Sequence, residues 1–128
     1  MDYLIGALSG FVFLAIYSRT SKETLADAAY TAFAVMVAIY VGAHLATSDF
    51  SRIVYEAAGA TLALGLALFL REKWPVGLGP LIFCHGAYDF AFGHAAGVAP
   101  WYPPVCVGFD LCVGLGVLVM ANRSDQRA

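Results

Sequence analysis

The chain has 128 residues, of which 61% are apolar and 12% charged, with a formal net charge of -2 and a mean hydropathy of +0.76. An ordinary globular domain is about half apolar and a quarter charged, so this chain has too few polar groups to cover a water-facing surface. The composition therefore predicts an integral membrane protein of one domain. It contains no basic tract, which argues against a nucleic-acid partner.

Five apolar runs follow one another and predict five transmembrane helices. The runs cover residues 3–18, 25–46, 53–70, 76–95 and 104–121. At about 1.5 Å per residue their lengths approach the ~30 Å hydrocarbon core of a bilayer. None shows the period-two alternation of a half-buried strand. We therefore expect an all-α fold, a polytopic membrane helical bundle that occupies residues 1–128 as a single domain.

The loop charges predict an orientation. Arg52 lies between the second and third runs, and the other basic residues fall on the opposite side of the membrane in a five-helix topology. Lys and Arg are enriched in cytoplasmic loops, so the N-terminus is expected outside and the C-terminus inside. The residues on the inner side are Arg19, Lys22, Arg71, Lys73, Arg123 and Arg127.

Helix ends can also be read from the sequence. Thr20-x-x-Glu23 predicts a capping box at the start of the second helix. Asp49 and Ser51 are candidate caps for the third helix, and Pro75 suits the first turn of the fourth.

The first helix carries the small-residue pattern Gly6-x-x-x-Gly10, which allows two helix backbones to approach closely. One interpretation is a homo-oligomer that forms through Gly6 and Gly10. The alternative is packing of the first helix within the same chain, for which Gly108-x-x-x-Cys112 in the last helix is a looser match.

Ionisable residues inside apolar runs are the strongest functional signal. Burying a charge in a membrane costs about 2.5–3.5 kcal/mol on insertion scales, so such a residue is a functional candidate by default. The predicted topology places six of them in the outer half of the membrane, with two acids at a matched depth of about 9 Å. The six are His44, Glu56, His85, Asp89, His94 and Asp110.

The spacing of these residues predicts which of them meet. His85 and Asp89 are four residues apart and share a helix face. Asp89 and Asp110 are expected to form the cross-helix contact. Asp89 would orient His85 or balance its charge, and Asp110 would act as the acid–base group or as a metal ligand. His94 lies half a turn away from His85 and joins the cluster only if Gly93 ends or kinks the helix.

Three chemistries use such a set, and the sequence leaves open which applies. Imidazoles and carboxylates bind Zn²⁺ or another divalent metal, which can activate water. Two buried carboxylates beside a His also suit metal-free acid–base catalysis, and transporters use similar sets as proton relays. The catalytic candidates are His85, Asp89 and Asp110, and the metal-ligand candidates are these three with His94, Glu56 and His44.

Each outer residue has a simpler explanation. Glu56 lies four residues after Arg52, which would suit an interfacial ion pair. His44, close to a helix end, would reach lipid head groups, and Asp89 with His85 would serve only to lock two helices together.

The segment that starts at His94 is rich in proline and aromatic residues and would lie in the membrane interface. It is either a lid that admits an apolar substrate or an interfacial anchor. The candidate substrate or lid residues are Tyr88, Trp101, Tyr102 and Cys106.

Residues 80–118 resemble an uncharacterised family of small bacterial integral membrane proteins. The resemblance rests on His85-Gly-x-x-Asp89, on His94, on Pro100-Trp-Tyr-Pro103 and on Cys106-x-x-x-Asp110. It implies a multi-pass protein of the bacterial inner membrane and supplies no activity. Members often carry a second His beside the one at position 94, where this chain has Gly93, and this difference weakens a metal role for His94.

The leading hypothesis is an intramembrane enzyme, acid–base or metal-dependent, that acts on a lipid or another apolar small molecule. One alternative is an oligomeric binding or transport subunit. Another is a structural subunit of a membrane complex, in which the polar cluster holds helices together.

Overall fold

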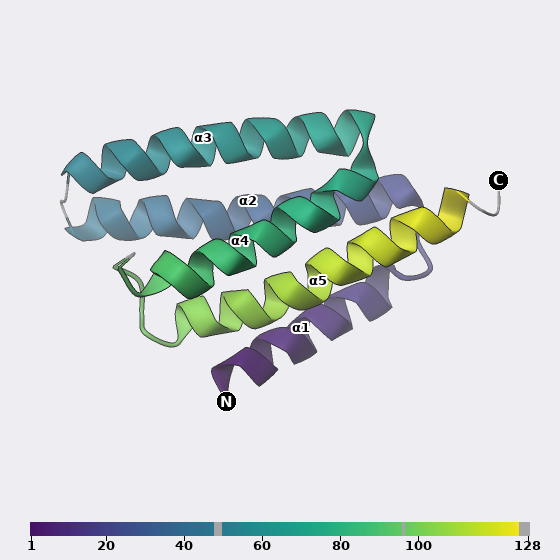
Figure 1. Ribbon diagram of the computed structural model, residues 1–128, viewed down its shortest axis with the longest axis horizontal. Helices are drawn as coiled ribbons and strands as arrows, with labels where there is room; N and C mark the ends of the chain where they lie inside the picture. Colours follow the sequence, from purple (N-terminus) through teal and green to yellow (C-terminus); the bar gives the residue numbers. More distant parts are fainter. Residues whose placement is uncertain (48–49, 96, 126–128) are drawn as a thin grey trace.

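The computed structural model describes residues 1–47, 50–95 and 97–125. Within these ranges the chain is all-helical and forms five α-helices, which confirms the predicted all-α class and the number of helices (Figure 1). The predicted cap Asp49, the tail residue Arg127 and the side chain of Arg123 lie outside what is described. The helices are α1 (Asp2–Tyr17), α2 (Lys22–Thr47), α3 (Phe50–Lys73), α4 (Leu78–Phe92) and α5 (Tyr102–Asp125).

The start of α2 differs from the predicted capping box. The hydroxyl of Ser21 accepts a hydrogen bond from the backbone N–H of Thr24 at 3.2 Å, so Ser21 is the capping residue. The Thr20 hydroxyl donates instead to the carbonyl of Tyr17, in the last turn of α1. The prediction of a box formed by Thr20 and Glu23 was therefore wrong by one residue. The connection is so short that the Thr20 side chain bonds to the end of α1 and the cap of α2 is the next residue, Ser21.

The fourth apolar run is helical but only partly α-helical. It opens with the 3₁₀ turn η1 (Pro75–Gly77), continues as the 15 residues of α4 and closes with the 3₁₀ turn η2 (Gly93–Ala95). The tighter turns are common at helix ends. As a result, α4 is shorter than α2, α3 and α5.

Helix α5 lies between α1 and α4 and contacts both along their lengths (Figure 1). It runs antiparallel to α4. A Cβ atom at Gly79 of α4 would lie 2.6 Å from the carbonyl oxygen of Gly114, and one at Gly114 would lie 2.8 Å from the carbonyl oxygen of Gly79. Only glycine permits this backbone approach.

Helices α1 and α5 run parallel and also meet through glycine (Figure 1). A Cβ at Gly6 would overlap the carbonyl of Val105, and one at Gly108 would overlap the carbonyl of Tyr3. Gly10 is buried against α5 as well. The small-residue pattern of α1 therefore packs within the chain, and a homo-oligomer stays a prediction.

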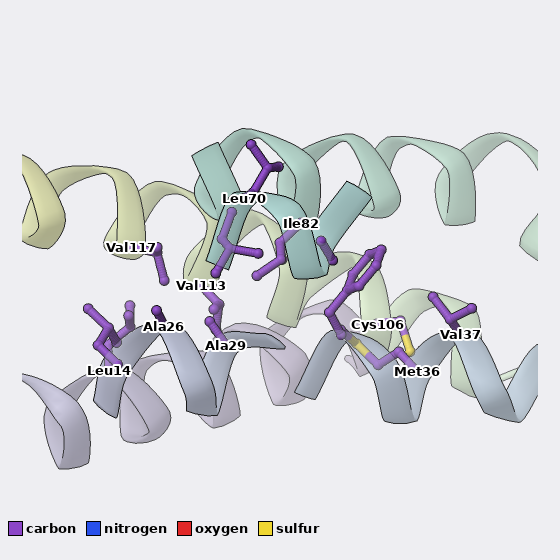
Figure 2. Close-up of a cluster of buried hydrophobic side chains, with 14 residues drawn as sticks. Leu14, Ala26, Ala29, Met36, Val37, Leu70, Ile82, Cys106, Val113 and Val117 are labelled. Carbon is purple, nitrogen blue, oxygen red and sulfur yellow. The ribbon is translucent and has the colours of Figure 1, made fainter. Parts of the chain in front are cut away.

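The hydrophobic core draws one or more side chains from every helix, among them Leu14, Ala26, Leu70, Ile82 and Val113 (Figure 2). Large apolar side chains also cover much of the outside. By length and composition, three segments are long and apolar enough to cross a membrane: Lys22–Ala46, Phe50–Lys73 and Tyr102–Asn122.

The two ends of the bundle differ in what they hold. The α1–α2 and α3–α4 connections lie at one end, and the C-terminal ends of α2 and α4 lie at the other, beside the N-terminal ends of α3 and α5 (Figure 1). His85 is the middle residue of α4, Asp89 lies in the second half of α4, and Asp110 lies in the first half of α5. The ionisable cluster is therefore displaced from the middle of the bundle toward the second end.

Candidate functional site

A buried hydrogen bond between α4 and α5 forms the centre of the site. His85 Nδ1 lies 2.8 Å from Asp110 Oδ2, and the Asp110 side chain is completely buried. A short contact between an imidazole and a carboxylate fixes the orientation of the ring and is stronger than a neutral hydrogen bond. Asp110 therefore holds His85 in one orientation.

Glycine makes this contact possible. Gly86 follows His85, and a Cβ atom there would lie 2.9 Å from the Cβ of Asp110. Any larger residue would separate α4 from α5 at the position where Asp110 reaches His85. The predicted H-G-x-x-D pattern thus includes a residue whose small size positions the site.

The hydrogen-bond partner of His85 differs from the predicted one. His85 bonds to Asp110, whereas Asp89 was expected to contact Asp110 and to orient His85 or balance its charge. His85 Nδ1 is 3.7 Å from Asp89 Oδ2, beyond hydrogen-bond distance. The carboxylates of Asp89 and Asp110 lie close together as expected, since one oxygen of each is within 4.8 Å of the other. The hydrogen bond of Asp110 nevertheless goes to His85, because a matched depth along the helices leaves their rotation undetermined.

Asp89 is buried without a hydrogen-bond partner. No described residue bonds to either of its carboxylate oxygens, nor to Oδ1 of Asp110. One ligand atom from each of His85, Asp89 and Asp110 fits within a 4.8 Å span. Buried carboxylate oxygens with no partner are costly, and a cation or a proton would satisfy them.

Aromatic rings enclose His85 on the α2 side. The rings of Phe33 and Tyr40 approach it edge-on, with centroids at 5.3 and 6.1 Å, and the ring of Tyr88 lies at 6.4 Å. The Tyr40 hydroxyl is buried and bonds to no described residue. Tyr40 is not among the site residues predicted from the sequence, although it lies four residues before His44 and so shares a helix face with that candidate.

A cleft of about 470 Å³ opens beside the imidazole. The His85 side chain is 11% exposed. Since Nδ1 is engaged with Asp110, Nε2 is the nitrogen that remains for a molecule in the cleft. Apolar and small side chains of α2, α3 and α4 form most of the lining, with Tyr55, Glu56 and Tyr88 toward one end.

The predicted outer residues His44 and Glu56 form a second polar group. Glu56 Oε1 accepts a hydrogen bond from the Tyr88 hydroxyl at 3.2 Å, and His44 Nε2 lies 3.6 Å from the same oxygen. Arg52 donates from Nη1 to the carbonyl of Ala95 at 2.6 Å. His44 and Glu56 do not belong to the group of three ligand atoms around His85.

His94 is separated from the imidazole of His85. Helix α4 ends at Phe92, so the helix does stop before His94 as the sequence allowed, but the side chain of His94 is exposed in the 3₁₀ turn. It lines a smaller hollow of about 210 Å³ together with Asp89 and Pro103. His94 is not among the three candidate ligands that the described residues bring together.

The candidate lid residues have different environments. Trp101 is exposed, and Tyr102 packs edge-on against Tyr40 with centroids 5.9 Å apart. Cys106 is buried in the hydrophobic core, and a contact with a substrate stays a prediction. Its position on the inner face of α5, one turn before Asp110, explains this burial.

No protein-family model matches the chain, and the searches of curated proteins and of solved structures likewise give no match. The resemblance to small bacterial membrane proteins over residues 80–118 therefore stays a prediction.

Proposed function

We propose that this chain is a multi-pass membrane protein, with its N-terminus outside and its C-terminus inside, that carries an intramembrane acid–base site for an apolar small molecule. Three helices with the length and apolar composition of membrane spans support the location. Large apolar side chains on the outside and buried acids on the inside are the distribution expected in lipid. The basic residues of the short connections support the orientation.

The observation that carries the activity is the Asp110–His85 pair beside the cleft. The carboxylate of Asp110 accepts from Nδ1 and would leave Nε2 to take a proton from a bound molecule or to return one. This division of roles, with one residue orienting the imidazole and the imidazole moving the proton, is common in acid–base catalysis. Asp89, 3.7 Å from the ring, would balance the positive charge when His85 gains a proton.

A second candidate is a divalent metal site at the same three residues, which the unpartnered oxygens of Asp89 and Asp110 favour. Ligands about 2.0–2.2 Å from a tetrahedral Zn²⁺ lie about 3.4 Å from one another. The 2.8 and 3.7 Å separations from His85 Nδ1 to the two carboxylates bracket that spacing. His85, Asp89 and Asp110 would hold the ion, and it would supply an activated water molecule.

Lipid turnover and metal content test the two candidates together. Purified protein is incubated with total lipid from a bacterial membrane, and products are followed by mass spectrometry, while bound metal is measured by elemental analysis. We expect His85→Asn and Asp110→Asn to slow turnover by about 10²–10⁴-fold, the usual contribution of a general acid or base. Glu72→Gln, an exposed acid at the far end of α3, is the control and should leave turnover unchanged.

The outcomes separate the alternatives. Turnover without bound metal supports the acid–base site, and turnover that disappears with a chelator and returns with Zn²⁺ supports the metal site. Full activity in Asp110→Asn sinks both. If the chain is instead a structural subunit, Asp110→Asn should impair assembly, and no lipid turnover should be detected.

A further inference from the structure

The cleft beside His85 adjoins a second hollow, at the end of the bundle where α4 ends and α3 begins. This second hollow, of about 260 Å³, is lined in part by His44, Arg52 and Phe92. Both hollows share Tyr55, Glu56 and Tyr88 as lining residues. We refer to the two hollows together as the groove. The cleft beside His85 is its apolar length, and the second hollow with Glu56 is its polar end.

The apolar length is suited to a hydrocarbon chain. Val37 of α2, Ala60 and Ala63 of α3 and Leu81 of α4 are among its lining residues. The α3 wall is low, because a Cβ atom at Gly59 would meet no atom within 4 Å. A volume of about 470 Å³ is within the range that holds one small ligand rather than a bulky one.

The polar end is suited to a hydrogen-bond donor. Glu56 presents a carboxylate there, with one oxygen bonded to Tyr88 and close to His44. The cation nearest in sequence, Arg52, donates to the carbonyl of Ala95. A carboxylate accepts hydrogen bonds from hydroxyl groups and repels an anionic head group at close range.

We propose that the groove binds a single-chain lipid with an uncharged, hydroxyl-bearing head group, held by Glu56 at the polar end with its chain along the apolar length. This inference rests on the proposed function for its location in the membrane and deepens it by naming the substrate class. In the proposed orientation the polar end of the groove lies toward the membrane surface and the apolar length toward its middle. The lipid therefore binds with the orientation it already has in the bilayer.

The groove also selects which part of the lipid meets His85. Tyr88, which bonds to Glu56, is three residues after His85 on α4, and this spacing is about 4.5 Å along the helix axis. The group that faces His85 Nε2 is thus within a few atoms of the head group. In an acyl glycerol this is the region of the ester linkage rather than the middle of the chain.

Native mass spectrometry in detergent tests the binding directly. The probes are monopalmitoyl glycerol, the lysophosphatidate with the same chain, which has an anionic head, and hexadecane, which has none. We expect the monoacyl glycerol to bind most tightly of the three. Glu56→Ala should weaken its binding by about tenfold or more, the effect of one hydrogen bond to a charged group, and Glu72→Ala should not.

Two glycine variants of α3 provide a matched test of the apolar length. Gly59→Leu fills the groove and should remove binding, whereas Gly65→Leu, on the same helix and equally free of neighbours, lies outside the groove and should keep it. Stronger binding of the lysophosphatidate, or equal binding by the two leucine variants, overturns the proposal.

Asp110→Asn separates this proposal from the proposed activity. Asp110 does not line the groove, so this variant should bind the monoacyl glycerol normally and fail to convert it. If turnover depends on Asp110 but neither Glu56→Ala nor Gly59→Leu weakens binding, the proposed activity stands and the proposed substrate class is wrong.

Discussion

The α4–α5 contact and the α3 side of the molecule use glycine in opposite ways. Between α4 and α5, Gly79, Gly86 and Gly114 bring two backbones together, and the buried His85–Asp110 pair lies in this contact. On α3, Gly59 and Gly65 face open space. The same residue type closes one interface and leaves the other open. The tight interface holds the charged groups in place, and the open side provides room for a ligand.

Leucine substitutions should give the largest difference between the two regions. Gly79→Leu places side-chain atoms against the backbone of α5, and overpacking of this kind costs about 3 kcal/mol or more when backbones must move apart. Gly65→Leu should change the free energy of unfolding very little. Reversible unfolding in mixed detergent micelles measures both. Equal destabilisation by the two variants would show that the α4–α5 contact is not the tighter one.

Tyr40→Phe should have a smaller effect and the opposite sign. The Tyr40 hydroxyl is buried without a described partner, and removing an unsatisfied group of this kind relieves a desolvation penalty. We expect the ligand-free protein to gain about 1 kcal/mol of stability in the same unfolding experiment. Tyr55→Phe, which changes an exposed ring, is the control. A loss of stability in Tyr40→Phe would mean that the hydroxyl already has a partner.

The smallest effect is expected for the ion pair that joins α2 to α3. Arg71 Nε contacts Asp27 Oδ1, and both side chains are substantially exposed. Exposed pairs contribute little and are screened by salt. Arg71→Ala should therefore change the free energy of unfolding by less than Gly79→Leu or Tyr40→Phe does. High salt should remove most of this small loss of stability, because it screens the ion pair in the unsubstituted protein. A large, salt-independent loss would indicate that the α2–α3 side depends on this pair.

The five helices could be predicted from the sequence because each apolar run is long and ends in polar or turn-forming residues. The residues that gather at the site could be predicted in part, since depth along an antiparallel pair follows from the helical rise. The rotation of each helix about its own axis could not be predicted in this way. For this reason the proximity of Asp89 and Asp110 could be predicted, but the hydrogen bond between Asp110 and His85, next to Gly86, could not. Tyr40 was missed because an apolar run with scattered tyrosines does not distinguish packing rings from rings that face a site.

The parallel contact of α1 with α5 has a consequence for biosynthesis. The two helices that pack through Gly6 and Gly108 are separated by almost the whole chain, so α1 leaves the ribosome long before its partner exists. The same late helix brings Asp110 to His85. An intermediate made of α1 to α4 would have His85 without Asp110 and the glycine face of α1 without its partner helix. When α5 packs against α1 and α4, it would cover the glycine face of α1 and bring Asp110 to His85 in the same step. The fold and the site would therefore be completed together.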